Sequence, residues 1–200
     1  MRIAIEGMDG AGKTTVAKNI AKELNYVYVT KPFTFLFDKF GFNEQQIKDI
    51  EWSLYETYDE ALISSFYGLG LLYGTRVLSY ENIIYDRHFV SNYYWHGNDE
   101  TEELHNKFIE LCGKPDLTIL LKASTNARMK RIAKRDAKDR DIDNSAMYDD
   151  GYDKMIKFLN DKNFNYLIID TENMTIEEVI EECLKKIGEC KSKHVRSKKK

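Results

Sequence analysis

Short apolar runs alternate along this chain with longer stretches in which apolar residues recur every three or four positions. The short runs are rich in β-branched and aromatic residues, which is typical of strands. They predict five strands, at residues 2–5, 26–30, 82–86, 116–121 and 166–170. Because these runs are apolar at nearly every position, we expect the strands to be buried on both faces.

The longer stretches predict helices. A first helix is expected to follow the first strand and to run to about Asn25. Residues 43–81 are mostly helical in pattern, and we expect an interruption around Gly68 and Gly70 because glycine disfavours a helix interior.

The last helix has the clearest signals at its two ends. Thr175 and Glu178 form a capping box, and the apolar face that follows, which includes Cys183, ends before Gly188. The alternation of strands and helices predicts an α/β fold in which helices cover both faces of a mainly parallel sheet. Ligands bind such sheets at the carboxyl ends of the strands.

Residues 7–14 match the phosphate-binding pattern G-x-x-x-x-G-K-[ST] at every position, and we call them the phosphate loop. Glycines let consecutive backbone N–H groups face a polyphosphate, Lys13 can reach its outer phosphates, and the Thr14 hydroxyl suits Mg2+. A chance turn is the alternative, but the strand before the loop and the helix after it argue against one. The expected ATP-binding residues are Gly7, Asp9, Gly10, Ala11, Gly12, Lys13, Thr14 and Thr15.

A polar segment from Asp86 to Asn92 follows the third predicted strand. Asp86 could hold Mg2+ directly or through water, and the planar guanidinium of Arg87 matches a phosphate. A purely structural Asp–Arg pair is the alternative, and the phosphate loop favours the functional interpretation. We interpret His88 as a packing or orienting residue and not as a general base.

Residues 124–145 are dense in charge and are expected to form a helical lid. Arg128, Arg131 and Arg135 share one helical face, and Arg140 follows them. A solvent-exposed charged face is the alternative, because like charges repel one another. A mobile lid that closes over a polyphosphate would use the same charges, and the phosphate loop favours it.

Composition limits the possible domain organisation, cellular location and partners of the protein. A chain of 200 residues, 42% of them hydrophobic, favours a single domain, which we place at residues 1–190. Three cysteines without disulfide or zinc spacing fit a reduced, cytoplasmic protein, and no apolar run approaches the length of a membrane span. Six of the 30 basic residues lie in residues 191–200, expected to be a disordered tail or, alternatively, a weak polyanion-binding arm. The acidic remainder argues against specific nucleic-acid binding.

Together these segments resemble the thymidylate kinase family. The resemblance rests on Ile5 to Thr15, on Leu72-Tyr73-Gly74-Thr75-Arg76, on Asp86-Arg87-His88 with Ser91-Asn92, on Pro115 to Thr118, and on an arginine-rich lid ending in Asp139-Arg140. It implies a three-layer P-loop NTPase fold with a five-stranded parallel sheet, of the nucleoside-monophosphate-kinase type. It further implies Mg-assisted phosphoryl transfer from ATP to a deoxynucleoside monophosphate, normally dTMP, by a homodimer.

The resemblance also implies roles for single residues. The implied acceptor-binding residues are Asp9, Leu72, Tyr73, Arg76, Arg87, Asn92 and Trp95. The implied catalytic residues are Lys13, Arg87, Arg131, Arg135 and Arg140, and the metal-binding residues are Thr14 and Asp86. Arg76 and Arg87 would hold the acceptor phosphate, and Asn92 would read the pyrimidine edge. Because the phosphate loop has no arginine of its own, the lid would bring that charge.

Two features depart from the family pattern on the acceptor side. Where the family commonly has Arg-Glu-Pro after the second strand, this chain has Thr30-Lys31-Pro32, and the aromatic residue that stacks on the base is replaced by Leu72 or displaced to Tyr73. Another pyrimidine or purine monophosphate therefore stays open as acceptor. A deoxynucleoside kinase of related fold is one alternative, although it needs a carboxylate base after the second strand, where none stands. An ATP-binding regulatory protein without turnover is the other.

Overall fold

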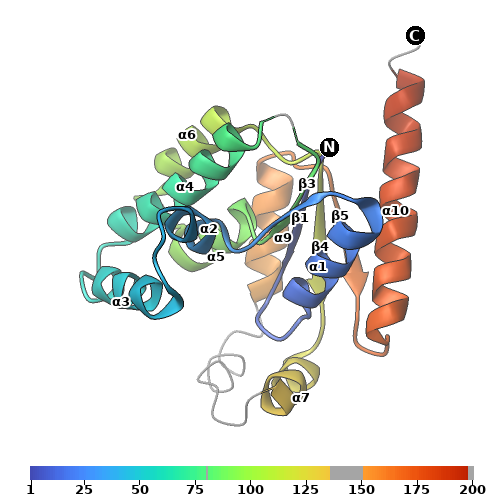
Figure 1. The fold of residues 1–200 in the computed structure, drawn as a ribbon, viewed down its shortest axis with the longest axis horizontal. Coiled ribbons are helices and arrows are strands. Elements are labelled where there is room, and N and C mark those ends of the chain that lie inside the picture. The colour runs from blue at the N-terminus through green and yellow to red at the C-terminus, as the bar shows by residue number, and fades with distance from the viewer. Residues whose placement is uncertain (80, 136–150, 198–200) are drawn as a thin grey trace.

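The computed structural model describes residues 1–79, 81–135 and 151–197 (Figure 1). The elements follow in the order β1 (Arg2–Gly7), α1 (Lys13–Leu24), β2 (Val27–Val29), α2 (Pro32–Lys39), α3 (Glu44–Tyr55), α4 (Glu60–Val77), β3 (Ile83–Asp86), α5 (Phe89–His96), α6 (Glu102–Cys112), β4 (Leu117–Lys122), α7 (Thr125–Arg135), α9 (Gly151–Asp161), β5 (Tyr166–Asp170) and α10 (Ile176–Ser197). The five predicted strands are therefore confirmed, with β2 shorter than expected.

The five strands form one parallel sheet in the order β2-β3-β1-β4-β5. β1 lies at its centre, so that Ile5 pairs with Asp86 of β3 and Gly7 pairs with Leu121 of β4. Because β1 and β3 are parallel neighbours, the segments that follow them leave the same edge of the sheet side by side. The topology thus brings the phosphate loop next to the segment that begins at Asp86.

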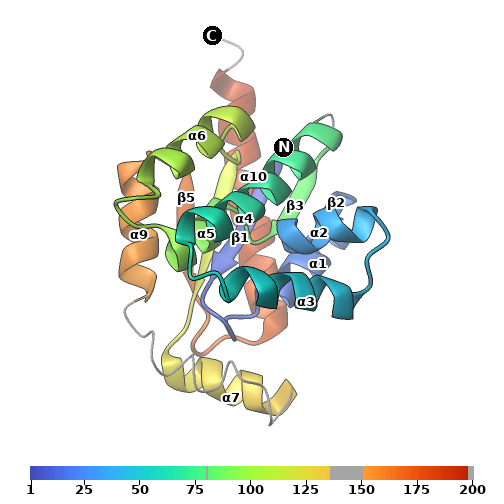
Figure 2. The ribbon, with the colours of Figure 1, turned by 90° about the vertical axis from the view of Figure 1, so that its left-hand side faces the viewer.

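Helices cover both faces of the sheet, as the alternating pattern predicted. α1 and α10 lie on one face, and α5 and α9 lie on the other, with α4 and α6 outside them (Figures 1 and 2). Ile119 and Leu121 of β4 join the core under α1 and α10, whereas Leu120 packs with Phe89 and Phe158 on the opposite face. Both faces of β4 are therefore buried, which explains its continuous apolar run.

Helix α4 passes through Gly68 and Gly70 without the predicted interruption. Both glycines are points of close approach: a Cβ on Gly68 would lie 2.1 Å from the Phe108 ring, and one on Gly70 would lie 2.6 Å from the Pro32 carbonyl oxygen. They are present for packing against α6 and α2, and the break in the helical pattern lies instead at residues 56–59.

Helix α10 begins at the predicted capping box but does not end at Gly188. The Glu178 amide donates to the Thr175 hydroxyl over 3.2 Å, and Cys183 is fully buried, as expected. The helix continues to Ser197, because Gly188 lies on an open face of the helix and makes no cap. Residues 191–197, expected to be disordered, are thus helical, and residues 198–200 lie outside the described part of the chain.

Three further expectations concern the chain as a whole. Among the residues described, no helix has the length and apolar character needed to cross a membrane. Cys112, Cys183 and Cys190 are free thiols. The single domain at residues 1–190 stays a prediction, as does the lid, since α7 is described but residues 136–145 are not.

Candidate active site

The phosphate loop turns directly from β1 into α1. Gly10 and Gly12 have positive φ angles of 80° and 95°, which glycine adopts without strain. A Cβ on Gly10 would also lie 2.6 Å from the Arg128 carbonyl oxygen, so space as well as conformation requires glycine there. Since α1 begins at Lys13, the loop lies at a helix N-terminus, where N–H groups and the helix dipole favour an anion.

Lys13 points back over this loop and is only 5% exposed. Its ammonium group donates to the Met8 carbonyl oxygen over 2.8 Å and lies 3.5 Å from the Asp9 carboxylate. Burial, together with the positive charge of Arg87, lowers the pKa of Lys13 to about 8 despite nearby carboxylates. A bound polyphosphate would add negative charge beside this buried ammonium and favour its protonated form.

Arg87 forms an ion pair with Asp9 across the mouth of the loop. Burial opposes ionisation of Asp9, but Arg87 and Lys13 outweigh it and hold the pKa of the Asp9 carboxyl well below its ordinary value. Arg87 itself has a φ of 75°, a left-handed conformation that costs a residue other than glycine about 1–3 kcal/mol. Its amide donates to the Ile5 carbonyl oxygen over 3.0 Å, which ties the strained residue to β1.

Glu6, to which the sequence analysis gave no role, organises the segment after Arg87. Its carboxylate is fully buried and accepts hydrogen bonds from the backbone amides of His88, Val90 and Ser91 at 2.8, 3.0 and 3.3 Å, and from the Ser91 hydroxyl at 2.5 Å. Burial raises its pKa although these donors oppose the rise. The available signal was a carboxylate inside an otherwise apolar strand, since such a group needs buried donors.

Thr14 and Asp86 come together, as the metal-site prediction requires. The Thr14 hydroxyl donates to Asp86 Oδ2 over 2.6 Å, and the Tyr28 hydroxyl donates to the same oxygen over 3.2 Å. Asp86 Oδ1 is buried and has no hydrogen-bond partner. No group of three or more His, Cys, Asp or Glu side chains that could hold a metal occurs in the described residues. A hydroxyl beside an unpaired carboxylate oxygen nevertheless fits Mg2+, which is held by few protein ligands together with phosphate and water.

A cavity of about 690 Å3, which we call the loop cavity, opens over the phosphate loop. Seven of the eight predicted ATP-binding residues line it: Asp9, Gly10, Ala11, Gly12, Lys13, Thr14 and Thr15. Gly7 does not, because it lies in the sheet, where a Cβ would meet the Leu121 carbonyl oxygen at 2.4 Å. Met174, Ile176 and Val179 give the cavity an apolar wall.

Helix α7 stands beyond the carboxyl edge of the sheet and places its arginines unequally (Figure 1). Arg131 lines the loop cavity and donates to the Thr171 carbonyl and hydroxyl oxygens at 2.6 and 3.0 Å. Arg128, predicted to share this helical face, is 0% exposed, which argues against the alternative of a solvent-exposed face at this position, and it donates to the Thr125 hydroxyl over 2.9 Å. The side chain of Arg135 and all of Arg140 lie outside the described part of the structure.

A second cavity, of about 740 Å3, lies between α3, α4 and α5, and we call it the helix cavity. Of the predicted acceptor residues, Asp9, Arg87, Asn92 and Trp95 line it. Asp9, Lys31 and Arg87 line both cavities, which therefore meet at these three residues. Six further residues that carry no recognisable motif in the sequence line the helix cavity too: Glu51, Trp52, Tyr55, Glu60, Tyr67 and His96.

Three predicted acceptor residues lie elsewhere. The Arg76 guanidinium donates to the Leu111 carbonyl oxygen of α6 over 3.1 Å and lines neither cavity. Tyr73 packs beside Phe35, and Leu72 joins the core around α5 and α9. All three fall in the last turns of α4, whereas the turns of α4 that line the helix cavity carry Glu60, Tyr67 and Leu71.

His88 is buried between Tyr85 and Phe89, with ring centroids 4.7 and 4.4 Å away. Burial and the nearby Arg2 charge lower its pKa to about 3, so its imidazole is neutral at pH 7. This geometry agrees with the interpretation of His88 as a packing residue.

Comparisons with known proteins find similar kinases. A family model described as thymidylate kinase matches residues 71–183. A probable thymidylate kinase of Methanococcus aeolicus is 28% identical over 92% of this chain and 94% of that protein. A thymidylate kinase structure from Candida albicans has a TM-score of 0.61 at 16% identity over 95% and 92% of the two chains. A deoxyadenosine kinase structure from M. mycoides has a TM-score of 0.59 at 22% identity over 94% and 100%.

Proposed function

The chain belongs to the thymidylate kinase family, and on this basis we propose that it transfers the γ-phosphoryl group of ATP to a deoxynucleoside monophosphate, converting dTMP to dTDP. The observation that carries the proposal is the meeting of the loop cavity and the helix cavity at Asp9, Lys31 and Arg87. A triphosphate in the first cavity and a monophosphate in the second would present their phosphates to each other there. Such a junction is what phosphoryl transfer needs, because its catalysis is mainly positioning and charge stabilisation.

On the donor side, the triphosphate would lie along the phosphate loop with its adenine toward the apolar wall of the loop cavity. The loop amides and Lys13 would bind the phosphates, and Arg131 would approach from α7. Arg135 and Arg140 of the lid are proposed to add charge there. Exclusion of water by a closed lid would limit hydrolysis of ATP.

Thr14 and Asp86 would hold Mg2+ beside the same phosphates. The ion, when bound, would neutralise charge on the β- and γ-phosphates. Tyr28 would keep Asp86 in position through its hydroxyl.

On the acceptor side, Arg87 and Lys31 would bind the monophosphate and aim one of its oxygens at the γ-phosphorus. A bond forms between that oxygen and phosphorus while the bond to the β-phosphate oxygen breaks, and ADP leaves. The acceptor oxygen is already ionised, so no general base is needed. The base would extend toward Asn92 and Trp95.

The proposal also covers the location, oligomeric state and partners of the protein. Free thiols at all three cysteines suit the cytoplasm. A homodimer, as the family resemblance implies, is proposed as the working form, without a membrane or a specific nucleic acid as partner.

A deoxynucleoside kinase is the second candidate, and the likeness to the deoxyadenosine kinase structure, at 22% identity, concerns the fold alone. That activity requires removal of a proton from a sugar hydroxyl, for which a carboxylate near the acceptor phosphate position is expected. At the junction of the cavities the segment after β2 contributes Lys31, and the carboxylate of Asp9 is held by Arg87 and Lys13. This candidate therefore fits less well.

The experiment that tests the proposal measures ADP formation from ATP and Mg2+ with dTMP or thymidine as acceptor. We expect dTMP to stimulate ADP release and thymidine not to. Turnover of thymidine alone would favour the nucleoside kinase, and ATP binding that no acceptor converts into ADP release would favour a regulatory protein. A folded Lys13→Ala variant serves as the background control.

A further inference from the structure

The junction of the two cavities is lined by one carboxylate and two cations, those of Asp9, Lys31 and Arg87. Arg87 forms an ion pair with Asp9, so these two charges offset each other. The net positive charge of the three residues is therefore that of Lys31. Two anionic substrates that meet at the junction repel each other, and a cation placed between them offsets this repulsion.

Two other cations that line the loop cavity are bound to acceptors of the protein itself. Lys13 donates to the Met8 carbonyl oxygen over 2.8 Å. Arg131 donates to the Thr171 carbonyl oxygen over 2.6 Å. The Lys31 side chain is exposed, and its ammonium group makes no hydrogen bond or ion pair with any of the described residues. The three hydrogen-bond donors of this ammonium are thus available to a ligand.

The backbone of Lys31 is held in place although its side chain is exposed. Pro32 follows it as the first residue of α2, and the Lys31 carbonyl oxygen accepts a hydrogen bond from the Phe35 amide over 2.9 Å. Helix α4 packs directly on this turn, since a Cβ on Gly70 would lie 2.6 Å from the Pro32 carbonyl oxygen. The lysine side chain therefore extends from a fixed point, and its flexible four-carbon stem lets the ammonium group reach a phosphate in either cavity.

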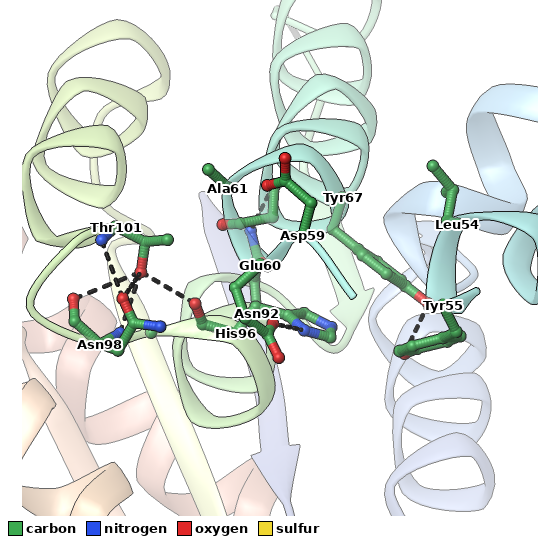
Figure 3. A network of polar contacts seen from close by, with 12 residues as sticks. Leu54, Tyr55, Asp59, Glu60, Ala61, Tyr67, Asn92, His96, Asn98 and Thr101 are labelled. Carbon is green, nitrogen blue, oxygen red and sulfur yellow. Dashed lines mark hydrogen bonds and ion pairs between the residues drawn. The ribbon is translucent and has the colours of Figure 1, made fainter. Parts of the chain in front are cut away.

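Only one end of the helix cavity suits a phosphate. Lys31 and Arg87 are the only lysine or arginine side chains that line this cavity in the described part of the chain. Glu51 and Glu60 line the wall formed by α3 and α4, where His96 Nδ1 lies 2.8 Å from Glu60 Oε2 (Figure 3). Because these carboxylates repel a phosphate, we expect the acceptor phosphate to lie beside Lys31 and Arg87.

The sequence departs from the family pattern at this same position. Where the family commonly has Arg-Glu-Pro, this chain has Thr30-Lys31-Pro32, so a cation stands where the pattern has a carboxylate. A carboxylate at this point would cancel the net positive charge of the junction, whereas Lys31 supplies it.

We propose that Lys31 is a catalytic residue, whose ammonium group contacts the acceptor phosphate and the transferred γ-phosphoryl group at the same time. In that step an acceptor oxygen forms a bond to the γ-phosphorus. The bond from this phosphorus to the β–γ bridging oxygen breaks, and its electron pair leaves with ADP. Lys31 transfers no proton, and it donates hydrogen bonds to oxygens of both phosphates where charge develops.

The inference rests on the proposed monophosphate kinase function and deepens it. In that function Lys31 binds the acceptor alone, and the charge around the transferred group comes from Lys13 and the lid. Contact with both phosphates gives the segment after β2 a part in the transition state as well. Loss of Lys31 should therefore lower kcat and not only raise the KM for the monophosphate.

The test measures kcat and KM of Lys31→Ala and Lys31→Arg with ATP, Mg2+ and dTMP. Removal of one donor to the transferring group typically costs about 100-fold in kcat, and we expect this loss in Lys31→Ala, with the KM for ATP changed by less than about threefold. Lys31→Arg should recover most of the kcat, because the charge is kept. A kcat of Lys31→Ala within about threefold of that of the unchanged protein would overturn the inference.

Two further variants separate the charge at the junction from charge elsewhere on α2. Lys31→Glu should lower kcat at least as far as Lys31→Ala, because a negative charge at the junction repels both phosphates. Lys39→Ala is the matched control, since Lys39 is exposed and its ammonium group lies over the Phe35 ring, 5.3 Å from the centroid. This variant should leave kcat unchanged. Equal losses in Lys31→Ala and Lys39→Ala would contradict the assignment to the junction.

A stable mimic of the transferred group distinguishes catalysis from binding. Aluminium fluoride with ADP and dTMP imitates the phosphoryl group between donor and acceptor. Lys31→Ala should weaken this complex at least about tenfold more than it weakens the binding of dTMP alone. Equal weakening of both would show that Lys31 only binds the acceptor and would overturn the inference. If the unchanged protein turns over no monophosphate, the proposed function itself fails.

Discussion

At the scale of single residues, Arg87 lies where the sequence pattern predicts it and Arg76 does not. Both were expected to hold the acceptor phosphate, but only Arg87 lines the helix cavity, and Arg76 binds α6. Arg87→Ala should raise the KM for the monophosphate about 10- to 100-fold, because charge-assisted hydrogen bonds to the phosphate are lost. Arg76→Ala should leave steady-state kinetics unchanged. Equal losses in both variants would contradict the geometry.

Lys13 links the reaction to pH through its lowered pKa of about 8. The ammonium group must be protonated to bind phosphate, so its charge is present below pH 8 and is lost as pH rises through that value. We expect kcat/KM for ATP to be level between about pH 6.5 and 7.5 and to fall about tenfold per unit well above 8. A Lys13→Arg variant that retains activity should not show this fall, since arginine stays charged. An alkaline limb shared by both proteins would assign it to another group.

The sequence was sufficient to predict the positions of those polar site residues that directly follow a strand. The phosphate loop follows β1, and Arg87 follows β3, so neighbouring parallel strands bring Asp9 and Arg87 together. Residues on α4 could not be placed in this way, because a helical pattern spanning residues 43–81 does not show where one helix ends. In the structure α4 begins only at Glu60, and its residues Glu60, Tyr67 and Leu71 line the helix cavity. Arg76 in its last turn does not.

At the scale of elements, Glu6 joins β1 to the start of α5. Glu6→Ala would leave three backbone amides of the α5 N-terminus without their acceptor, and we expect a loss of about 2 kcal/mol or more of unfolding free energy. The KM for the monophosphate should rise as well. Glu6 would no longer hold the backbone of His88, the residue next to Arg87, and Arg87 would be less firmly positioned. Urea denaturation and steady-state kinetics measure the two effects.

Glu6→Gln is the conservative control for that prediction. The amide oxygen still accepts from the backbone, and the Ser91 hydroxyl can accept from the new amide nitrogen. The variant should therefore keep most of the stability and acceptor affinity. If Glu6→Gln and Glu6→Ala lowered the unfolding free energy equally, the stabilisation would come from the negative charge of Glu6 and not from its hydrogen-bond geometry.

The helices were harder to predict than the strands. The central strands β1, β3 and β4 are mainly apolar because both faces of the sheet are covered there, whereas Ile168 in the edge strand β5 is 42% exposed, although both faces were expected to be buried. Helices α2, α5, α6 and α9 gave no clear signal in the sequence. Phe33, Phe35 and Phe37 of α2 alternate as in a strand and pack only once α4 is beside them. His88 precedes α5 without a side-chain cap, because the Glu6 carboxylate, distant in sequence, binds the first amides instead.

At the scale of the whole molecule, the two cavities join into one elongated space. Because they meet at Asp9, Lys31 and Arg87, a compound that joins adenosine to a deoxynucleoside through a polyphosphate should fill both. We expect such a compound to bind at least about 100-fold tighter than ADP or the monophosphate alone, since the second half binds intramolecularly. Calorimetry measures the three affinities. A linked compound no tighter than ADP would show that the cavities cannot be occupied together.

The glycines of α4 bear on the order in which the chain folds. Each glycine in a helix interior costs about 1 kcal/mol relative to alanine, so a segment containing Gly68, Gly70 and Gly74 has little tendency to be helical by itself. Its helix becomes favourable only when Phe108 and Pro32 close onto these positions. We therefore expect α4 to condense together with α2 and α6, late and cooperatively, while the sheet with α1 supplies the earlier nucleus.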